Sequence, residues 1–304
     1  MVKIFLGRLT VQNLVTIAIP TYNRAQSFLR DTITAALGQT WSNVEVIVGD
    51  NASTDMTAEV VGEFDDDRLR YVRHESNIGP NANFNHLLKI ARGDWFLLFH
   101  DDDMIDEDFI EYCMAGLEPN IDCGFIRTGV RAIDGDGKIL KERKNLPIGK
   151  SKEDFYLSWF RSKIGLYLCN TLYNTHKLQN IGGFHSPHNL LEDNFALARL
   201  LEKWAHIDLP EVKASYRYTY DQRTNNVPVL NWCEDFAELL EIVKFQCSKN
   251  KYEMVSIEGR RFFGQLCVRR ANVIPSVRKK VIARIQVAYF FGLRTLRLPW
   301  KNRV

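Results

Sequence analysis

Three consecutive carboxylates, Asp101, Asp102 and Asp103, follow the short apolar run at residues 95–99. A run of this length is typical of a strand that is buried on both faces of a sheet. In an open parallel sheet, ligands bind at the carboxyl ends of the strands. Because crowded carboxylates repel one another, the cluster needs a counter-charge, and a divalent cation is the usual one. The alternative is a solvated acidic turn that precedes the next helix.

Two further polar clusters follow predicted strands at residues 14–20 and 44–49. The residues concerned are Pro20, Thr21, Tyr22 and Arg24 at the end of the first strand, and Asp50 and Asn51 after the second. A third, shorter strand is predicted at residues 69–73, and another near residues 214–218. Strands and helices alternate over the first part of the chain, which predicts right-handed βαβ units and a parallel sheet. The three clusters then meet at one edge of the sheet, where they favour a pocket for nucleotide, phosphate and metal.

The phosphates of such a ligand must be held by metal and side chains. The segment from Pro20 to Ala25 contains no glycine, which excludes the dinucleotide-binding fingerprint after the first strand. The lysine and hydroxyl signature of a P-loop is also absent after this strand.

Four spaced motifs in the first 110 residues resemble those of the family 2 glycosyltransferases of GT-A fold. They are Val15-Thr-Ile-Ala-Ile-Pro-Thr-Tyr-Asn-Arg24, Val46-Ile-Val-Gly-Asp-Asn-Ala-Ser-Thr-Asp55, Asn77-Ile-Gly79 with Ala91-Arg-Gly93, and the acidic triple. The resemblance continues more weakly through Ile181-Gly-Gly-Phe184, Glu192-Asp193 and Tyr216-Arg217. It implies an inverting transferase that moves a sugar from a nucleoside diphosphate, with UDP the expected nucleotide, to an acceptor hydroxyl. Surface polysaccharide or glycolipid synthesis is the expected context.

The resemblance also implies roles for individual residues on the donor side. Asp50 resembles the carboxylate that hydrogen-bonds the donor base, and Asp102 resembles the principal ligand of Mn²⁺ or Mg²⁺. Asp101 is expected near the ribose and diphosphate, and is the second candidate for the metal. His100 departs from the family, which often has Asp two residues before the main ligand. It is a core-facing residue, a diphosphate contact or a metal ligand. The remaining residues expected to bind the donor are Pro20, Thr21, Tyr22, Arg24 and Asn51.

On the acceptor side, Glu192-Asp193 resembles the acidic pair of the family, in which the Asp is the catalytic base. In-line displacement at the anomeric carbon needs a carboxylate on the face opposite the leaving group, where it takes the proton of the acceptor. The alternative is that Glu192 and Asp193 only stabilise the start of a helix at residues 194–204. Gly182 and Gly183 just upstream predict a tight turn that lets the backbone approach the sugar.

The expected architecture is an α/β fold of GT-A type, with a mostly parallel central sheet and a helical C-terminal extension. Residues 1–110 form the nucleotide-sugar half of the main domain, residues 111–225 the acceptor half, and residues 226–304 the basic helical region.

Six scattered cysteines without a C-x-x-C pair predict reduced core thiols. A cytoplasmic protein is the default expectation, because no apolar run approaches the ~20 residues of a membrane span and the N-terminal Met1 to Gly7 is too short for a signal peptide.

Charge is unevenly distributed along the chain. Residues 259–304 contain nine Arg, three Lys and no acidic residue, so they carry +12; the whole chain is +3, so the first 258 residues carry −9. The apolar segment at residues 281–293 predicts either a helix lying in an anionic membrane interface, at the inner face of the cell membrane, or a helix that packs on the acidic domain. Nucleic-acid binding is not expected, because the aromatic residues of the tail lie in apolar runs. The residues that support a membrane interface flank or interrupt the apolar segment; they are Arg278, Lys279, Lys280, Arg284, Arg294, Arg297 and Trp300.

Two other functions compete with sugar transfer. A nucleotidyltransferase on a related sheet would need a glycine-rich loop with basic residues after the first strand, where only Arg24 is present. A catalytically silent homologue that acts as a binding partner is the other alternative. Intact Asp50, Asp102 and Asp193 argue against it.

Overall fold

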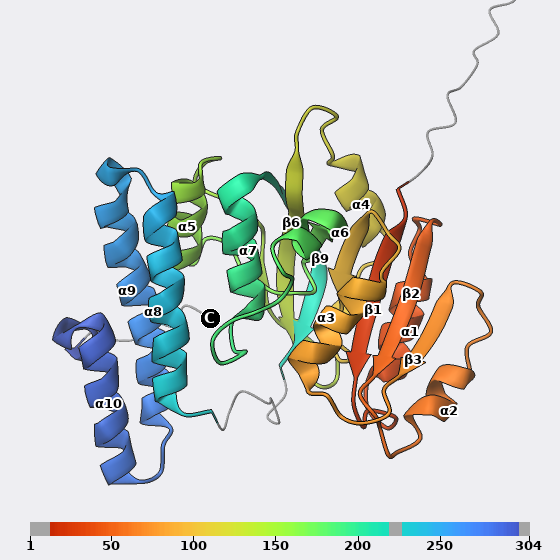
Figure 1. Ribbon diagram of the computed structural model, residues 1–304, viewed down its shortest axis with the longest axis horizontal. Helices are drawn as coiled ribbons and strands as arrows, with labels where there is room; N and C mark the ends of the chain where they lie inside the picture. Colours follow the sequence, from red (N-terminus) through yellow and green to blue (C-terminus); the bar gives the residue numbers. More distant parts are fainter. Residues whose placement is uncertain (1–12, 219–226, 298–304) are drawn as a thin grey trace, which may run out of the picture.

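The computed structural model describes residues 13–218 and 227–297, and a single curled sheet runs through its centre (Figure 1). Nine strands form the sheet in the order β3-β2-β1-β4-β8-β6-β9-β5, and β7 pairs with β6. The strands are β1 (Val15–Thr21), β2 (Val44–Asp50), β3 (Leu69–Arg73), β4 (Trp95–Leu98), β5 (Met104–Ile105), β6 (Cys123–Ile133), β7 (Ile139–Arg143), β8 (Thr171–Asn174) and β9 (Ala205–Arg217).

The first four strands form the parallel half of the sheet. β1 pairs in parallel with β2 and β4, and β2 with β3, so that Thr21, Asp50 and Arg73 end their strands at the same level. Every residue of β1, β2 and β4 is buried, as their mostly apolar runs predict. The polar exceptions Thr16 and Glu45 pair with each other, because the Thr16 hydroxyl donates to the Glu45 carboxylate at 2.6 Å. Beyond β4 the sheet is mixed. β8 is antiparallel to both β4 and β6, whereas β6 and β9 are parallel.

Helices cover both faces of the sheet, and each face has its own hydrophobic core. On one face lie α1 (Leu29–Leu37), α2 (Thr57–Gly62) and α4 (Phe109–Ala115), whose apolar residues share one core. Within it α1 packs on β1 and β2, and α4 packs on β6 and β9. On the other face lie α3 (Pro80–Ile90), α5 (Lys152–Phe160), α6 (Thr175–Asn180) and α7 (Glu192–Lys203). Apolar residues recur at helical spacing along the long α7 and face the sheet, as in an amphipathic helix.

The C-terminal region consists of α8 (Val229–Gln246), α9 (Lys249–Asn272), α10 (Val277–Phe291) and the short η2 (Leu293–Arg297). These helices stand beside α5 and α7 at one end of the molecule (Figure 1) and share their hydrophobic core. Phe263 of α9 stacks on Phe236 of α8 with ring centroids 4.2 Å apart, and its ring centre is 5.2 Å from that of Phe160 at the end of α5. The basic tail therefore packs on the α/β domain, whereas Trp300 and the N-terminal Met1 to Gly7 lie outside the described residues.

All six cysteines are free, and five of them are buried. Among the described residues, no helix has both the length and the apolar character needed to cross a membrane.

Candidate active site

Asp50 ends β2 with a side chain that is only 1% exposed. One carboxylate oxygen accepts the backbone N–H of Ser53 at 2.8 Å. The other accepts the hydroxyl of Tyr71 at 2.5 Å and lies 3.5 Å from the guanidinium of Arg73. Burial and the bond to Asp50 together raise the pKa of the Tyr71 hydroxyl. A carboxylate can accept about four hydrogen bonds; two are made here and Arg73 approaches as an ion pair, so at least one acceptor position remains for an incoming N–H group.

The loops after β1 and β2 are tied together by backbone and side-chain hydrogen bonds. The N–H of Asn51 donates to the carbonyl of Thr21 at 3.0 Å, and its side-chain amide bonds Asn77 and the N–H of Ile78. Asn23, in the left-handed region at φ +54°, donates its N–H to the Ser53 hydroxyl at 2.8 Å. The turn after β1, the turn after β2 and the Asn77-Ile-Gly79 loop thus form one connected structure at the sheet edge.

Asp101 lies between the first strand end and the acidic loop. It is 9% exposed, and Arg24 approaches its carboxylate at 3.9 Å. Burial raises the pKa of Asp101 to about 6, and the charge of Asp102 adds to this effect, whereas Thr21 and Arg24 oppose it. The structure therefore brings together Thr21, Arg24 and Asp101, which the sequence predicted to meet.

His100, Asp102 and Asp103 form a group that could hold a cation, because their ligand atoms all lie within 4.8 Å of one another. Asp103 is buried, and burial followed by the charge of Asp102 raises its pKa. Two carboxylates are the ligands that Mg²⁺ and Mn²⁺ prefer, and the imidazole suits transition metals. This donor set fits a divalent cation. Asp101, which the sequence proposed as a second ligand, lies outside this group and faces Arg24.

Arg217 at the end of β9 holds the acidic loop in place. Its backbone N–H donates to the carboxylate of Asp103 at 3.1 Å, and its Nε donates to the carbonyl of Asp102 at 2.9 Å. Its Nη1 reaches the carbonyls of Asp134 and Gly135 in the turn between β6 and β7. Arg217 is only 6% exposed, and its guanidinium therefore offsets part of the negative charge of the loop from a fixed position.

Asp193 lies in the first turn of α7, next to the nearly buried Glu192. Burial raises the pKa of Asp193 to about 7, and the charge of Glu192 adds to the shift. Tyr173 of β8 lies close enough for the charge of Asp193 to raise the pKa of its buried hydroxyl. The Asp193 carboxylate also interacts with the backbone N–H groups of Asn194 and of Asp193 itself, so it stabilises the start of α7 as well. A carboxyl group with a pKa near neutrality is suited to exchange protons.

The segment that leads to this acidic pair is built on α3. Gly183 has φ +75° and lies against the side chain of Asn85, where a Cβ atom would collide with the amide oxygen. Asn85 accepts the N–H of Phe184 and donates to its carbonyl, both at 2.9 Å, and Asn81 donates to the same carbonyl at 2.8 Å. The predicted tight turn is thus present, and the close approach is to an asparagine pair on α3.

The C-terminal helices hold the other end of the same segment. Asp235 of α8 accepts the N–H of His188 at 3.0 Å, and Glu234 lies 2.7 Å from the His188 ring. The hydroxyl of Ser186 accepts the N–H groups of Leu190 and Leu191, just before α7. The position of Asp193 therefore depends on α8, a region that lies outside the sequence resemblance.

Two parts of the predicted site are connected through β8. The donor-side residues cluster at the ends of β1, β2 and β4, whereas Asp193 lies beside Tyr173 in β8. Cys169, two residues before β8, lies against the carboxylate of Asp103. Of the other predicted donor residues, Pro20 is buried within β1 and Tyr22 is 45% exposed.

Sequence reasoning missed Tyr71 and Arg73 as partners of Asp50. A signal was present, because a basic residue ends the short predicted strand at residues 69–73, next along the chain to the strand that Asp50 ends. Arg217 had only the weak signal of the Tyr216-Arg217 pair. Cys169 had no signal, since its contact with Asp103 depends on the antiparallel pairing of β8 with β4.

Asp50→Asn is expected to weaken nucleoside diphosphate binding by about tenfold or more, the scale of one hydrogen bond to a charged group, while the remaining binding still requires metal. Asn keeps an acceptor for the Ser53 N–H but removes the charge opposite the base. The matched control is Tyr71→Phe, which removes one bond to Asp50 and keeps its carboxylate. Isothermal titration with UDP checks both, and unchanged affinity in the Asn variant would disprove the base pocket.

Comparison with known proteins places these features in a family. The model of glycosyl transferase family 2 matches residues 16–182. The GalNAc(5)-diNAcBac-PP-undecaprenol beta-1,3-glucosyltransferase of Campylobacter jejuni is 31% identical over 154 residues, which are 48% of each protein. The chain spans about half or less of the length of the curated relatives it matches.

Solved structures share the fold. S. aureus TarS 1-349, in complex with UDP-GlcNAc, has a TM-score of 0.61 at 15% identity, over 93% of this chain and 89% of that one. The mannosyltransferase PcManGT of Pyrobaculum calidifontis, in complex with GDP-Man and Mn²⁺, has a TM-score of 0.58 at 15% identity, over 95% of this chain and 86% of that one. Both likenesses extend over the C-terminal helices as well as the sheet.

Proposed function

Because the chain belongs to glycosyl transferase family 2, we propose that it transfers a sugar from a nucleoside diphosphate to an acceptor hydroxyl, with inversion at the anomeric carbon. One observation carries the proposal. The ends of β1, β2 and β4 converge on a charged edge where Asp50, Arg24 and the acidic loop lie together. Ligands of such sheets bind at this edge.

The donor is proposed to bind with its base against Asp50 and its diphosphate near Asp101 and Asp102. The free acceptor position on Asp50 suits an N–H of a pyrimidine or purine base. UDP is the proposed nucleotide, supported by the UDP-GlcNAc complex of one structural neighbour, although another neighbour binds GDP-Man. Tyr22 and Thr21 would line the ribose from the β1 side, and Asn51 holds the loop that faces them.

Mn²⁺ or Mg²⁺ is proposed to bind Asp102 with help from His100 and Asp103. When bound, the cation offsets charge that develops on the departing diphosphate. The chain itself supplies Arg217, which holds the backbone of Asp102 and Asp103 in place. The Mn²⁺ complex of PcManGT supports this assignment. Of the three roles left open for His100, the grouping of its ring with two carboxylates favours metal ligation.

Asp193 is proposed to take the proton of the acceptor hydroxyl as the sugar is transferred. Its half-buried position at the start of α7 and its pKa of about 7 support this role. Glu192, beside it, raises that pKa and is proposed to contact the acceptor. The acceptor is proposed to be a glycan or a lipid-linked glycan, because one relative is named for an acceptor joined to undecaprenol through a diphosphate. Surface polysaccharide or glycolipid synthesis is the pathway that follows from this acceptor.

A thermal-shift screen of nucleoside diphosphates, with and without Mn²⁺, tests the proposal. We expect UDP to raise the melting temperature when Mn²⁺ is present and to have little effect with EDTA, because ligand binding to the folded state stabilises it. A screen in which no nucleoside diphosphate stabilises the protein would favour a homologue without a donor site.

The exposed face of α10 is proposed to lie on an anionic membrane. Val281, Ile282, Ile285 and Tyr289 are exposed, whereas Val287 faces the core. Arg278, Lys279, Lys280 and Arg284 accompany the apolar residues along the same helix. A helix with basic residues beside an exposed aromatic and aliphatic face suits the interface of an anionic bilayer. Each basic residue near such a surface contributes about 1 kcal/mol.

Full-length protein is therefore expected to float with anionic liposomes, and Ile285→Glu/Tyr289→Glu is expected to abolish flotation. Both side chains are more than 60% exposed, so the variant keeps the packing of α10. Leu146→Glu/Ile148→Glu, with two exposed residues in the loop between β7 and α5, is the matched control. Equal flotation of all three proteins, or of none, would assign the tail to packing alone.

A further inference from the structure

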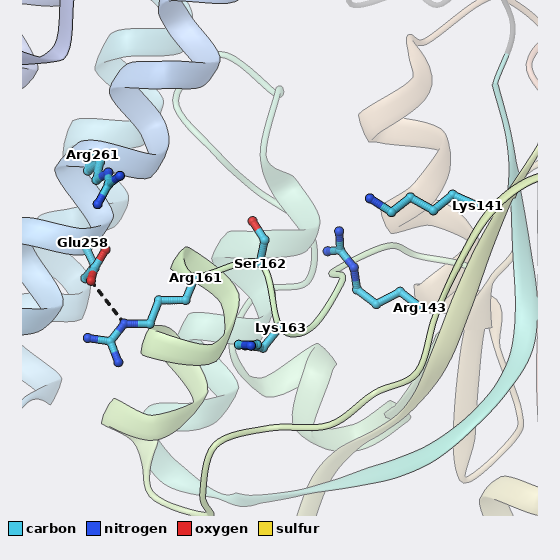
Figure 2. Close-up of a pocket in the computed structure, with 7 residues that line it drawn as sticks. All are labelled: Lys141, Arg143, Arg161, Ser162, Lys163, Glu258 and Arg261. Carbon is cyan, nitrogen blue, oxygen red and sulfur yellow. Dashed lines mark hydrogen bonds and ion pairs between the residues drawn. The ribbon is translucent and has the colours of Figure 1, made fainter. Parts of the chain in front are cut away.

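A basic pocket of about 610 Å³ lies between β7, the end of α5 and α9, away from the site described above (Figure 2). Glu258 and Ser162 line it together with five cationic side chains. The cations are Lys141, Arg143, Arg161, Lys163 and Arg261. Figure 2 shows Lys141 and Arg143 extending from one wall, and Arg261 and Glu258 on the opposite wall.

Only one of the five cations has its charge balanced within the described residues. Arg161 donates to Glu258 at 3.1 Å. Glu258 is the one carboxylate among the residues that line the pocket, so this ion pair uses it. Lys141, Lys163 and Arg261 form no ion pair in the described part of the chain. Burial and the nearby charge of Arg143 lower the pKa of Lys141. Like charges gathered in one hollow attract an anion, because their summed field is focused there.

The backbone holds this arrangement in a conformation that is uncommon for its residues. Ser162 has φ +56°, in the left-handed region that side chains other than glycine rarely adopt. Its N–H donates to Trp159, and the N–H of Lys163 donates to Ser158 at 2.7 Å. Such residues often occur at ligand sites, where the surrounding structure maintains them. Cations near the end of α5 also suit the negative end of the helix dipole. That effect does not explain the cations on β7 and α9.

The pocket is connected to the acidic loop by the hairpin of β6 and β7. Arg143 pairs with Val130, and the hairpin turn at Asp134 and Gly135 accepts hydrogen bonds from Arg217. Val130 and Asp134 are four residues apart, which is about 13 Å along a strand. Arg217 also bonds the carbonyl of Asp102. An extended molecule that follows β7 can therefore reach from the pocket towards the edge where transfer is proposed.

We propose that this pocket binds a phosphate group of the acceptor. Arginine and lysine side chains from three elements supply charge-assisted hydrogen bonds, the strongest kind for phosphate oxygens. The assignment of the phosphate to the acceptor rests on the proposed function. The binding of phosphate itself does not, because the pocket is separate from the donor residues.

Titration calorimetry with pyrophosphate, in EDTA and without donor, tests the phosphate site on the full-length protein. The pocket variant is Lys141→Gln/Lys163→Gln, since both side chains are exposed and form no hydrogen bond in the described residues. The control, Lys144→Gln/Lys150→Gln, removes the same charge nearby but outside the pocket. We expect wild-type protein and control to bind alike, and the pocket variant to bind at least about tenfold more weakly. Equal binding by the pocket variant, or none by wild type, overturns the proposal.

A second titration assigns the phosphate to its source. Farnesyl-diphosphate-linked N-acetylglucosamine is expected to bind at least about tenfold more tightly than the octyl glycoside of the same sugar, and this difference should vanish in the pocket variant. An undiminished difference in that variant overturns the acceptor assignment. A second outcome would also overturn the acceptor assignment: the pocket variant loses flotation with phosphatidylglycerol vesicles but binds the diphosphate-linked sugar normally. The pocket would then bind the phosphate of a membrane lipid. Pyrophosphate binding without any donor hydrolysis would contradict the proposed function and leave the pocket standing.

Discussion

Asp193→Asn is expected to lower the rate of sugar transfer by at least about 10²-fold, the scale of a lost general base, while donor binding stays near that of wild type. Asn has almost the shape of Asp but cannot accept the proton of the acceptor. Asp193 is not among the residues that surround the donor edge, so the nucleotide should bind as before. Transfer rates measured at saturating donor, together with UDP titrations, separate the two effects.

The pH dependence of transfer gives this prediction a second readout. Only the deprotonated carboxylate can accept a proton, and the pKa of Asp193 is about 7. The wild-type rate should therefore rise with pH up to about neutrality and level off above it, whereas the residual rate of the Asn variant should lack that rise. Glu192→Gln removes a neighbouring charge and should shift the rise to lower pH, because that charge raises the pKa of Asp193. A nearly wild-type rate for Asp193→Asn would assign the base to Glu192 or another carboxylate.

Asp102→Ala is expected to abolish metal-dependent nucleotide binding and leave the fold intact. The side chain is partly exposed, and the hydrogen bond from Arg217 is made to the backbone carbonyl, which the substitution keeps. Loss of one of three adjacent carboxylates also relieves repulsion on Asp101 and Asp103. UDP titrations with Mn²⁺ and with EDTA measure the loss, which we expect to exceed about 10²-fold, the scale of losing a metal-mediated contact.

A matched control is Asp136→Ala, in the exposed turn between β6 and β7. It removes one negative charge near the acidic loop without touching the group of His100, Asp102 and Asp103. We expect it to bind UDP with Mn²⁺ as wild type does. If Asp102→Ala bound UDP with undiminished affinity, or if EDTA had no effect on wild type, the metal assignment would be wrong.

Much of the donor half of the fold could be predicted because its signals are local. The runs of β1, β2 and β4 are mostly apolar, and β3 was predicted with the bounds it has. β5 has only two residues, and it exists because Met104 and Ile105 pair with Ser215 and Ala214 far along the chain. The first half of β9 was also missed, since its residues are mostly half-exposed and include Pro210. Such strands depend on pairing, which a linear pattern does not record.

The same limit applies to the candidate site: residues at strand ends could be predicted from local patterns, whereas the directions of their side chains could not. The sequence places Asp50 and the acidic triple at strand ends, and the parallel register of β2 and β4 with β1 then brings those ends level. The direction in which each acidic side chain points depends on the turn after β4, where the N–H of Asp103 donates to the carbonyl of His100. That turn sets Asp101 against Arg24 and groups His100 with Asp102 and Asp103. Because the three adjacent residues are all Asp, the sequence does not indicate which of them faces Arg24 and which two group with His100.

The dependence of Asp193 on α8 also could not be predicted. His188 bonds Glu234 and Asp235 across more than forty intervening residues. No motif marks either partner, and the contact arises because α8 packs beside α7 in a shared core. The helical region is therefore part of the proposed catalytic structure as well as the proposed membrane contact.

Metal-dependent use of a nucleotide sugar can be measured as hydrolysis of UDP-sugars in the absence of an acceptor. We expect wild-type protein to release UDP from at least one UDP-sugar when Mn²⁺ is present, and we expect EDTA or Asp102→Ala to stop the release. A protein that binds and hydrolyses no nucleotide sugar with Mn²⁺, or whose release of UDP is the same in EDTA, would contradict this expectation.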